Sequence, residues 1–145
     1  NRTVPPLNYV RVYHLKRDFP ELEIVINGGL TTIAQVDEVL EHFDGAMIGR
    51  QAYHQPYFLA DLEQHFNAGW DMPSRADVVE AMLPYVEREL AAGVPLNSIS
   101  RHMLGLFAEQ PGARAWRRYI SEHAHHEGAG GEVLVNALNA MPAAA

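Results

Sequence analysis

The sequence predicts an α/β segment followed by an all-α segment. Two short apolar runs, residues 22–26 and 45–48, each stop at a turn with glycine and lead into a helical pattern, which predicts two buried strands in βα units. No strand pattern appears after residue 73, where apolar residues recur at helical spacing. A chain of 145 residues is long enough to bury one ordinary core.

The expected elements of the α/β segment are a helix over residues 7–19, a strand over 22–26, a helix over 33–43, a strand over 45–48 and a helix from 50 to about 66. Pro20 ends the first helix, Thr32 and Gln35 form a capping box for the second, and Pro56 kinks the third. Two successive βα units require parallel strands, and two strands alone do not make a stable parallel sheet. We therefore expect further strands upstream and a chain whose N-terminal part is missing.

A change of composition over residues 67–73 predicts a domain boundary, with one domain over residues 1–69 and another over 70–145. In the second domain Ser74 and Asp77 cap a helix that runs to residue 92, and further helices follow Asn97, Gly112 and Gly131. Short connections predict an antiparallel helical bundle. The residues expected to face inward are Val79, Met82, Leu83, Val86, Leu90, Ile99, Met103, Leu106, Phe107, Trp116, Tyr119, Ile120, His123, Val133, Leu134, Ala137, Leu138 and Met141.

Composition excludes several classes of function. The net charge of -7 argues against nonspecific nucleic-acid binding by the chain as a whole. The absence of cysteine excludes disulfides, thiolate metal ligands and a cysteine nucleophile or acid within this chain, and it favours an intracellular setting. No apolar stretch reaches the roughly 20 residues that span a bilayer, and no signal peptide is recognisable.

The two glycine turns, residues 27–29 and 49–50, predict a phosphate site. Glycine allows a ligand to approach the backbone, and a helix that opens after each turn directs N–H groups toward it. Arg50 adds a guanidinium, and Asn27 offers a hydrogen-bonding side chain. The alternative is that strand ends simply need glycine for tight turns. We favour phosphate binding, since (β/α)₈ barrels often build a phosphate site from the loops after strands seven and eight.

Arg114, Arg117 and Arg118 are spaced to share one helix face. Residues 98–121 contain four arginines and a single acid, Glu109, so this segment is locally basic within an acidic chain. Arginine suits phosphate because its planar guanidinium binds oxygen pairs in a fork. A solvated helix face and a phosphate-binding face both remain open interpretations.

His123, His125 and His126 lie at a helix end, but their spacing matches no standard metal site. We favour one packed and two exposed histidines, and we expect no metal. The sequence also lacks a Ser-His-Asp spacing, a P-loop lysine and a Gly-x-Gly-x-x-Gly motif.

The chain resembles the tRNA-dihydrouridine synthases, most closely their bacterial A-type subfamily. The resemblance covers essentially the whole chain, as the C-terminal portion of such an enzyme. The segments that carry it are Pro-Pro-Leu-Asn-Tyr (5–9), Ile-Asn-Gly-Gly (26–29), Asp-Gly-Ala-Met-Ile-Gly-Arg (44–50), Ser-Arg-His-Met-Leu-Gly-Leu-Phe (100–107), Pro-Gly-Ala-Arg (111–114) and Trp-Arg-Arg-Tyr (116–119).

This resemblance implies the last two βα units of a TIM (β/α)₈ barrel, followed by a helical tRNA-binding domain. It implies a cytoplasmic enzyme with FMN as cofactor and NADPH as reductant, which reduces uridines in the D-loop of tRNA. The residues that match the FMN phosphate loops of the family are Asn27, Gly28, Gly29, Gly49 and Arg50. Those that match the arginines with which the subfamily orients tRNA are Arg2, Arg114 and Arg117.

The catalytic acid of the family is a cysteine on an upstream barrel loop, so we expect no catalytic residue in this chain. We also expect the isolated chain to bind FMN poorly.

Two alternatives to a tRNA-dihydrouridine synthase are considered. One is a flavin or sugar-phosphate TIM-barrel oxidoreductase without an RNA substrate. The other is a noncatalytic helical interaction module over residues 74–141.

Overall fold

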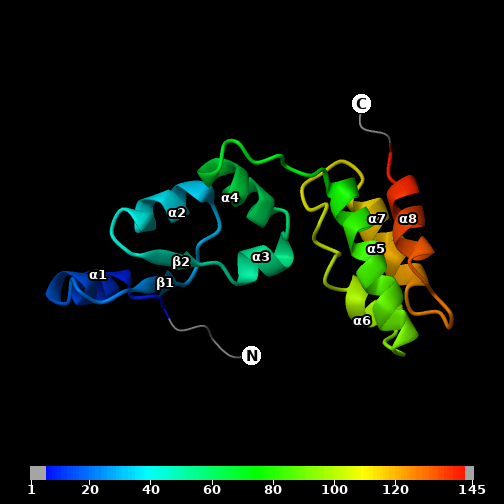
Figure 1. Cartoon of the computed structure of the whole chain (residues 1–145), viewed down its shortest axis with the longest axis horizontal. Coiled ribbons are helices and arrows are strands. Elements are labelled where there is room, and N and C mark those ends of the chain that lie inside the picture. The colour runs from blue at the N-terminus through cyan, green and yellow to red at the C-terminus, as the bar shows by residue number, and fades with distance from the viewer. Residues whose placement is uncertain (1–5, 143–145) are drawn as a thin grey trace. The chain divides into compact units, whose positions relative to one another are not determined.

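The computed structural model describes residues 6–142. Its elements are α1 Tyr9–Asp18, β1 Val25–Asn27, α2 Ile33–Leu40, β2 Gly45–Met47, α3 Arg50–His54, α4 Phe58–Phe66, α5 Arg75–Ala91, α6 Leu96–Ser100, α7 Ala113–His123 and α8 Glu132–Asn139 (Figure 1). They fall into two compact units, an N-terminal unit that ends at Gln51 and a C-terminal unit that begins at Ala52. Within the described residues, no helix is both long and apolar enough to cross a membrane.

The C-terminal unit starts earlier than the domain boundary predicted between residues 69 and 70, because the segment around Tyr57 packs with the start of α5. The Tyr57 hydroxyl donates a hydrogen bond to the Pro73 carbonyl at 2.7 Å. The Arg75 guanidinium lies 3.7 Å from the centre of the Tyr57 ring, and its Nε donates to the Leu106 carbonyl at 3.0 Å. A compact unit defined by contacts need not coincide with a domain, so the boundary between residues 69 and 70 stays a prediction.

The N-terminal unit contains the predicted pair of parallel strands, but β1 is Val25–Asn27 rather than residues 22–26, and β2 ends at Met47 rather than at residue 48. Residues Val25 and Asn27 of β1 lie opposite Gly45 and Met47 of β2. The capping box of α2 is confirmed, since Thr32 Oγ1 accepts from the Gln35 N–H at 3.2 Å and Gln35 Oε1 accepts from the Thr32 N–H at 3.2 Å. The buried apolar residues of this unit are Ile26, Leu30, Val36, Val39 and Phe43.

One ion pair fastens α1 to the strands. Lys16 Nζ donates to Asp44 Oδ2 at 2.7 Å and to the Leu22 carbonyl at 2.8 Å. The same carboxylate oxygen accepts from the backbone N–H of Ile24 at 2.8 Å. The Ile24 N–H and, next, the Lys16 ammonium therefore hold the pKa of Asp44 below its ordinary value.

Three helix predictions for residues 7–66 need correction. Helix α2 ends at Leu40, three residues before its predicted end at residue 43. The helix predicted from residue 50 to 66 is in fact two helices, α3 and α4, interrupted over residues 55–57, because Pro56 has no N–H to continue the helical hydrogen bonds. The first helix begins at Tyr9 rather than Leu7, because Asn8 caps it by accepting the Arg11 N–H at 3.0 Å.

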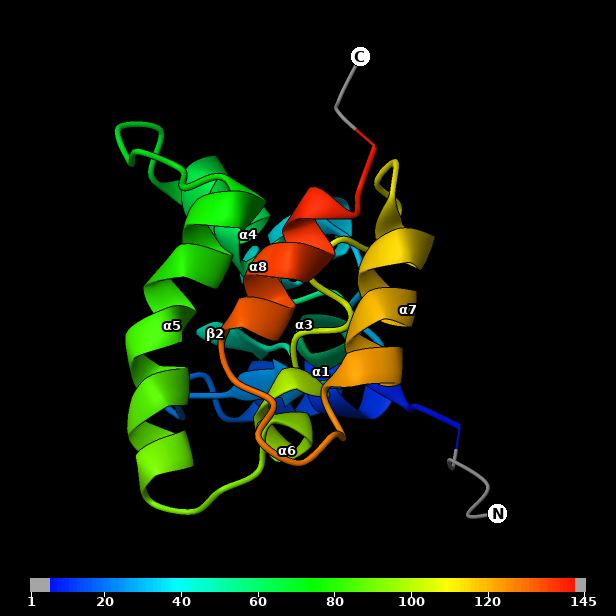
Figure 2. The same ribbon diagram turned by 90° about the vertical axis from the view of Figure 1, so that its right-hand side faces the viewer.

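The C-terminal unit packs its helices around a buried apolar core. In Figure 2, α8 lies between α5 and α7 and runs in the opposite direction to both. Trp116 has no exposed surface, and its indole Nε1 donates to the Met103 carbonyl at 3.1 Å while its ring lies 4.8 Å from that of Phe107. The buried residues of the core are Val79, Val86, Leu96, Ile99, Met103, Leu106, Phe107, Trp116, Ile120, Ala124, Val133, Leu134 and Ala137. The inward pattern predicted for this region is therefore largely confirmed.

The second helix predicted for this region is much shorter than expected. It ends at Ser100, and residues 101–110 form successive turns that still bury Met103, Leu106 and Phe107. These turns bring Gly105 against the backbone of His54, where an added Cβ would clash with the His54 carbonyl oxygen. The turns thus carry the apolar residues into the core without forming a regular helix.

Candidate functional site

The two glycine turns lie at the same edge of the small sheet. Because β1 and β2 are adjacent and parallel, with Asn27 opposite Met47, the residues that follow each strand emerge at its carboxyl edge. This register brings together the five residues predicted to bind the cofactor. Asn27, Gly49 and Arg50 are exposed there, and no hydrogen bond or ion pair joins the Arg50 side chain to another residue in the described range.

The first turn is shaped by close packing against Leu7, which precedes α1, and Tyr9, the first residue of α1. Gly28 and Gly29 have φ angles of +133° and +68°, a region that other L-residues rarely adopt. A Cβ on Gly28 would lie 2.8 Å from Leu7 Cδ2, and the Tyr9 hydroxyl donates a hydrogen bond to the Gly28 carbonyl. The fold itself therefore explains both glycines. The supporting roles of Leu7 and Tyr9 had no local sequence pattern that predicted them.

Gly49 in the second turn differs from the first two glycines. Its φ lies outside the left-handed region, and an added Cβ would meet only Met47 Sδ and Cε at ordinary distances of 3.6 and 3.7 Å. Folding does not require glycine here, whereas close approach of a ligand to the backbone would. Gly49 is thus the glycine whose presence the phosphate interpretation explains best.

The N-termini of α2 and α3 contribute less to a phosphate site than the sequence predicts. At the start of α2, the capping box already occupies the Thr31 and Thr32 N–H groups with Gln35 Oε1. Helix α3 has only five residues, so its macrodipole is small. A phosphate at this edge would rest mainly on the turn backbone, with Arg50 as its cationic partner.

The arginine face of α7, defined as Arg114, Arg117 and Arg118, is exposed opposite the buried side chains of Trp116 and Ile120. Arg118 Nε pairs with Glu122 Oε1 at 2.8 Å, and this contact raises the pKa of the Arg118 guanidinium. Within residues 6–142, no hydrogen bond or ion pair engages the side chains of Arg114 or Arg117. These two arginines are therefore available to a ligand. Arg2, the third predicted tRNA-binding residue, lies outside the described residues.

The histidines at the end of α7 stack rather than converge on an ion. The His123 ring stacks on Tyr119 at 4.0 Å, and the His125 and His126 rings meet edge to face at 4.5 Å. In the part of the chain that the structure describes, no group of three or more His, Cys, Asp or Glu side chains is placed to hold a metal ion.

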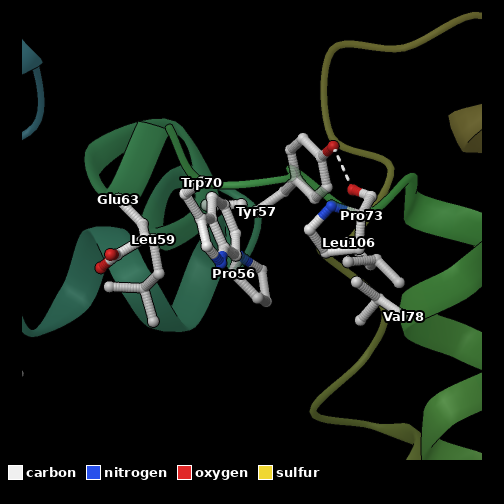
Figure 3. Close-up of a pocket in the computed structure, with 9 residues that line it drawn as sticks. Pro56, Tyr57, Leu59, Glu63, Trp70, Pro73, Val78 and Leu106 are labelled. Carbon is white, nitrogen blue, oxygen red and sulfur yellow. Dashed lines mark hydrogen bonds between the residues drawn. The ribbon is translucent and has the colours of Figure 1, made fainter. Parts of the chain in front are cut away.

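A separate pocket of about 490 Å³ lies between α4 and the start of α5 (Figure 3). The figure shows Trp70 beside Pro56, and the hydrogen bond from Tyr57 to Pro73 at its rim. Apolar atoms dominate its lining, and Glu63 is the only charged side chain among the described residues that line it. This pocket does not suit an anion.

Comparison with known proteins identifies the family. The whole span from residue 1 to 142 matches the dihydrouridine synthase (Dus) family, and the chain belongs to this family. It is 50% identical over 98% of its length to a tRNA-dihydrouridine(20/20a) synthase of Vibrio cholerae, and 56% identical over 92% of its length to the enzyme of that name from Shewanella oneidensis. A relative with the same name from Escherichia coli is 51% identical over 95% of the chain.

The chain spans less than half of these relatives, 44% of the Vibrio protein, 40% of the Shewanella protein and 42% of the Escherichia protein. Dihydrouridine synthases are flavin-dependent TIM-barrel enzymes. A small parallel sheet with mostly helical surroundings is consistent with part of such a barrel.

Proposed function

We propose that this chain is the C-terminal part of an FMN-dependent tRNA-dihydrouridine synthase, which uses NADPH to reduce D-loop uridines of tRNA in the cytoplasm. The observation that carries this proposal is the identity of 50 to 56% to tRNA-dihydrouridine(20/20a) synthases over nearly all of the chain. The names of these relatives make positions 20 and 20a the first to test.

We propose that the two βα units are the last two of a TIM (β/α)₈ barrel, within a domain over residues 1–69. Residues 70–145 would form an antiparallel helical bundle that binds tRNA. Val25 of β1 and Met47 of β2 support the barrel part, since they are 53% and 47% exposed although they belong to a parallel sheet. Parallel sheets are normally covered on both faces, so additional strands and helices would bury these side chains.

The FMN phosphate would be held by Asn27, Gly28, Gly29, Gly49 and Arg50. The exposed carboxyl edge of two parallel strands, a glycine that folding does not require and an unpaired arginine support this assignment. When bound, FMN supplies the hydride chemistry, and the protein positions it. This chain has no cysteine, so the thiol that serves the family as proton donor would come from the rest of the protein.

Arg2, Arg114 and Arg117 would orient the tRNA through its phosphates. Contacts to phosphate fix the position of a nucleic acid without reading its sequence. Arg114 and Arg117 suit this role because they are exposed and lie one helical turn apart on α7. The target base must also leave its stack to reach a flavin, which requires the tRNA to be held firmly.

The proposal is tested in the full-length protein that carries this chain, with tRNA that lacks dihydrouridine and with NADPH. We expect dihydrouridine at positions 20 and 20a, detected by mass spectrometry of tRNA fragments. Arg114→Ala and Arg117→Ala should each weaken tRNA binding and reduce its salt slope by about one, while FMN content stays unchanged.

Arg88 provides the matched control, since it is an exposed arginine of α5 outside the arginine face. Arg88→Ala should leave both the affinity and the slope unchanged. Retention of FMN without tRNA binding at low salt would instead favour a barrel oxidoreductase that has no RNA substrate. Absence of FMN from the full-length protein would contradict the flavoenzyme assignment.

A further inference from the structure

A second pocket in the C-terminal unit has the chemistry of an anion site. It has a volume of about 350 Å³ and lies between α6 with the turn that follows it on one side and the second half of α7 with the two residues after it on the other. Its polar lining comes from Asn97, Ser100, Arg101, Ser121 and His125. None of the described residues that line it is acidic.

Arg101 is the cation of this pocket. Its Nε donates to His102 Nε2 at 3.1 Å, which leaves the two terminal guanidinium nitrogens for a ligand. Such a pair of nitrogens binds two oxygens of a phosphate at once. On the opposite wall, His125 Nδ1 donates to the Ser121 carbonyl at 3.2 Å, and this bond fixes the imidazole at the rim.

The pocket continues the arginine face along α7. Ser121 follows Arg114 by seven residues and Arg117 by four, and these spacings place all three on one side of the helix. His125 lies in the turn that follows α7. With the rise of an α-helix, Ser121 lies about 6 Å beyond Arg117 and about 10 Å beyond Arg114 along the axis. Arg114, Arg117 and the pocket therefore form one continuous row of groups that suit phosphate.

We propose that the pocket lined by Arg101, Asn97 and Ser121 binds a phosphate of the RNA backbone, next in line after the phosphates held by Arg114 and Arg117. This inference rests on the proposed function, because it assigns a further contact for the same tRNA. Arg101 is held in place by His102 and the pocket wall, whereas Arg114 and Arg117 lie on an open helix face. The pocket thus fixes one phosphate position, and the arginine face extends the contact along the strand.

The decisive experiment measures tRNA affinity as a function of salt for the full-length protein and its Arg101→Gln variant. Loss of one phosphate contact should reduce the salt slope by about one and weaken binding about fivefold at physiological salt. Arg88→Gln is the matched control and should change neither quantity. An unchanged slope for Arg101→Gln would overturn the inference.

Ser121→Asp and Ser121→Ala separate electrostatics from packing. Both changes lie on the exposed side of α7, so far-ultraviolet circular dichroism should remain that of the unchanged protein. The carboxylate should weaken tRNA binding at least as much as Arg101→Gln, whereas the alanine should have an effect of less than about twofold. Equal effects of the two variants would contradict an anion site.

Titration with inorganic phosphate, followed by NMR at the Asn97 side-chain amide, distinguishes a free anion from RNA. We expect the chemical shift of this amide to change at millimolar phosphate concentrations, and we expect this change to disappear in Arg101→Gln. If phosphate binds while the tRNA salt slope of Arg101→Gln is unchanged, the pocket takes a free phosphate and the RNA assignment is wrong. If the unchanged protein binds no tRNA at all, the proposed function fails, and the phosphate titration still decides whether the pocket binds an anion.

Discussion

The C-terminal unit buries its apolar side chains, whereas the N-terminal unit leaves many of its own in solvent. Val79, Val86 and Trp116 have no exposed surface, but Val25 and Met47 in the strands are about half exposed, and α1 has no buried residue at all. The difference follows from the kind of structure. Helices from one continuous stretch can close a core among themselves, whereas two parallel strands need neighbours that come from elsewhere in the chain.

The largest expected effect is a difference in hydrogen exchange between the two units of the 145-residue chain. Backbone amides of α5, α7 and α8 should exchange only through global unfolding of their unit, while those of β1 and β2 exchange through local opening. The two opening free energies should differ by several kcal/mol, as they do between core elements and weakly held elements of other proteins (~5 kcal/mol). Exchange measured by NMR checks this.

The same measurement on the full-length protein sharpens the comparison. If the rest of a barrel covers the strands, the amides of β1 and β2 should become as protected as those of α5. Equal protection of both units in the 145-residue chain would show instead that the N-terminal unit is stable by itself.

The second prediction concerns the close packing of the C-terminal unit. Gly105→Ala places a methyl group against the His54 carbonyl oxygen and should cost about 3 kcal/mol, since a packed backbone has little room to shift. Urea denaturation followed by tryptophan fluorescence measures it, because both tryptophans, Trp70 and Trp116, belong to this unit. Gly69→Ala is the control and should have little effect, as its Cβ would meet only Asn67 Oδ1 at 3.9 Å.

Local patterns in the sequence predicted much of this fold. Both capping boxes, the parallel strands and the inward-facing residues of the C-terminal unit follow from spacing over a few positions. Spacing did not predict the turns at residues 101–110, because buried residues at 99, 103, 106 and 107 suit a helix equally well. The approach of Gly105 to His54 joins positions far apart in the sequence, and no periodicity reports it.

At the candidate site too, local sequence patterns predicted individual residues but not the contacts between distant segments. The sequence predicted which glycines and which arginine stand at the strand ends, because these residues follow directly from the strand pattern. It did not predict that Leu7 and Tyr9 shape the first turn, or that Arg101 shares a pocket with Ser121 and His125. In each case, segments that are separate in the sequence meet only after folding.

The third prediction compares two glycines of the proposed phosphate site in the full-length protein: Gly28, which the backbone conformation requires, and Gly49, which it does not. Gly28→Ala forces a side chain into a left-handed backbone and against Leu7, and it should cost about 1 to 2 kcal/mol of stability. Gly49→Ala should change stability by less than about 0.5 kcal/mol, because its Cβ meets no close contact. It should nevertheless weaken FMN binding, measured by flavin fluorescence. Unchanged FMN affinity in Gly49→Ala would contradict the assignment of this turn to the cofactor phosphate.

The smallest expected effect compares the two capping boxes, one in each unit, whose third helical residues differ in whether they ionise. The third helical residue is Asp77 in α5 and Gln35 in α2, so only the first box titrates. The Ser74 side chain and then its backbone N–H hold the pKa of Asp77 below the ordinary value of 3.8. A lowered pKa in the folded state contributes stability above pH 3.8 that is lost as the pH falls below it.

At pH 7, Ser74→Ala and Thr32→Ala should each cost their own helix about 1 kcal/mol. The cost of Ser74→Ala should shrink as the pH falls from 5 to 3, because the protonated Asp77 has already lost part of its hydrogen bonding, while the cost of Thr32→Ala should stay constant. Urea titrations at several pH values, read by tryptophan fluorescence for α5 and by hydrogen exchange for α2, measure both costs. A pH-independent cost for Ser74→Ala would mean that the Asp77 carboxylate does not stabilise the start of α5.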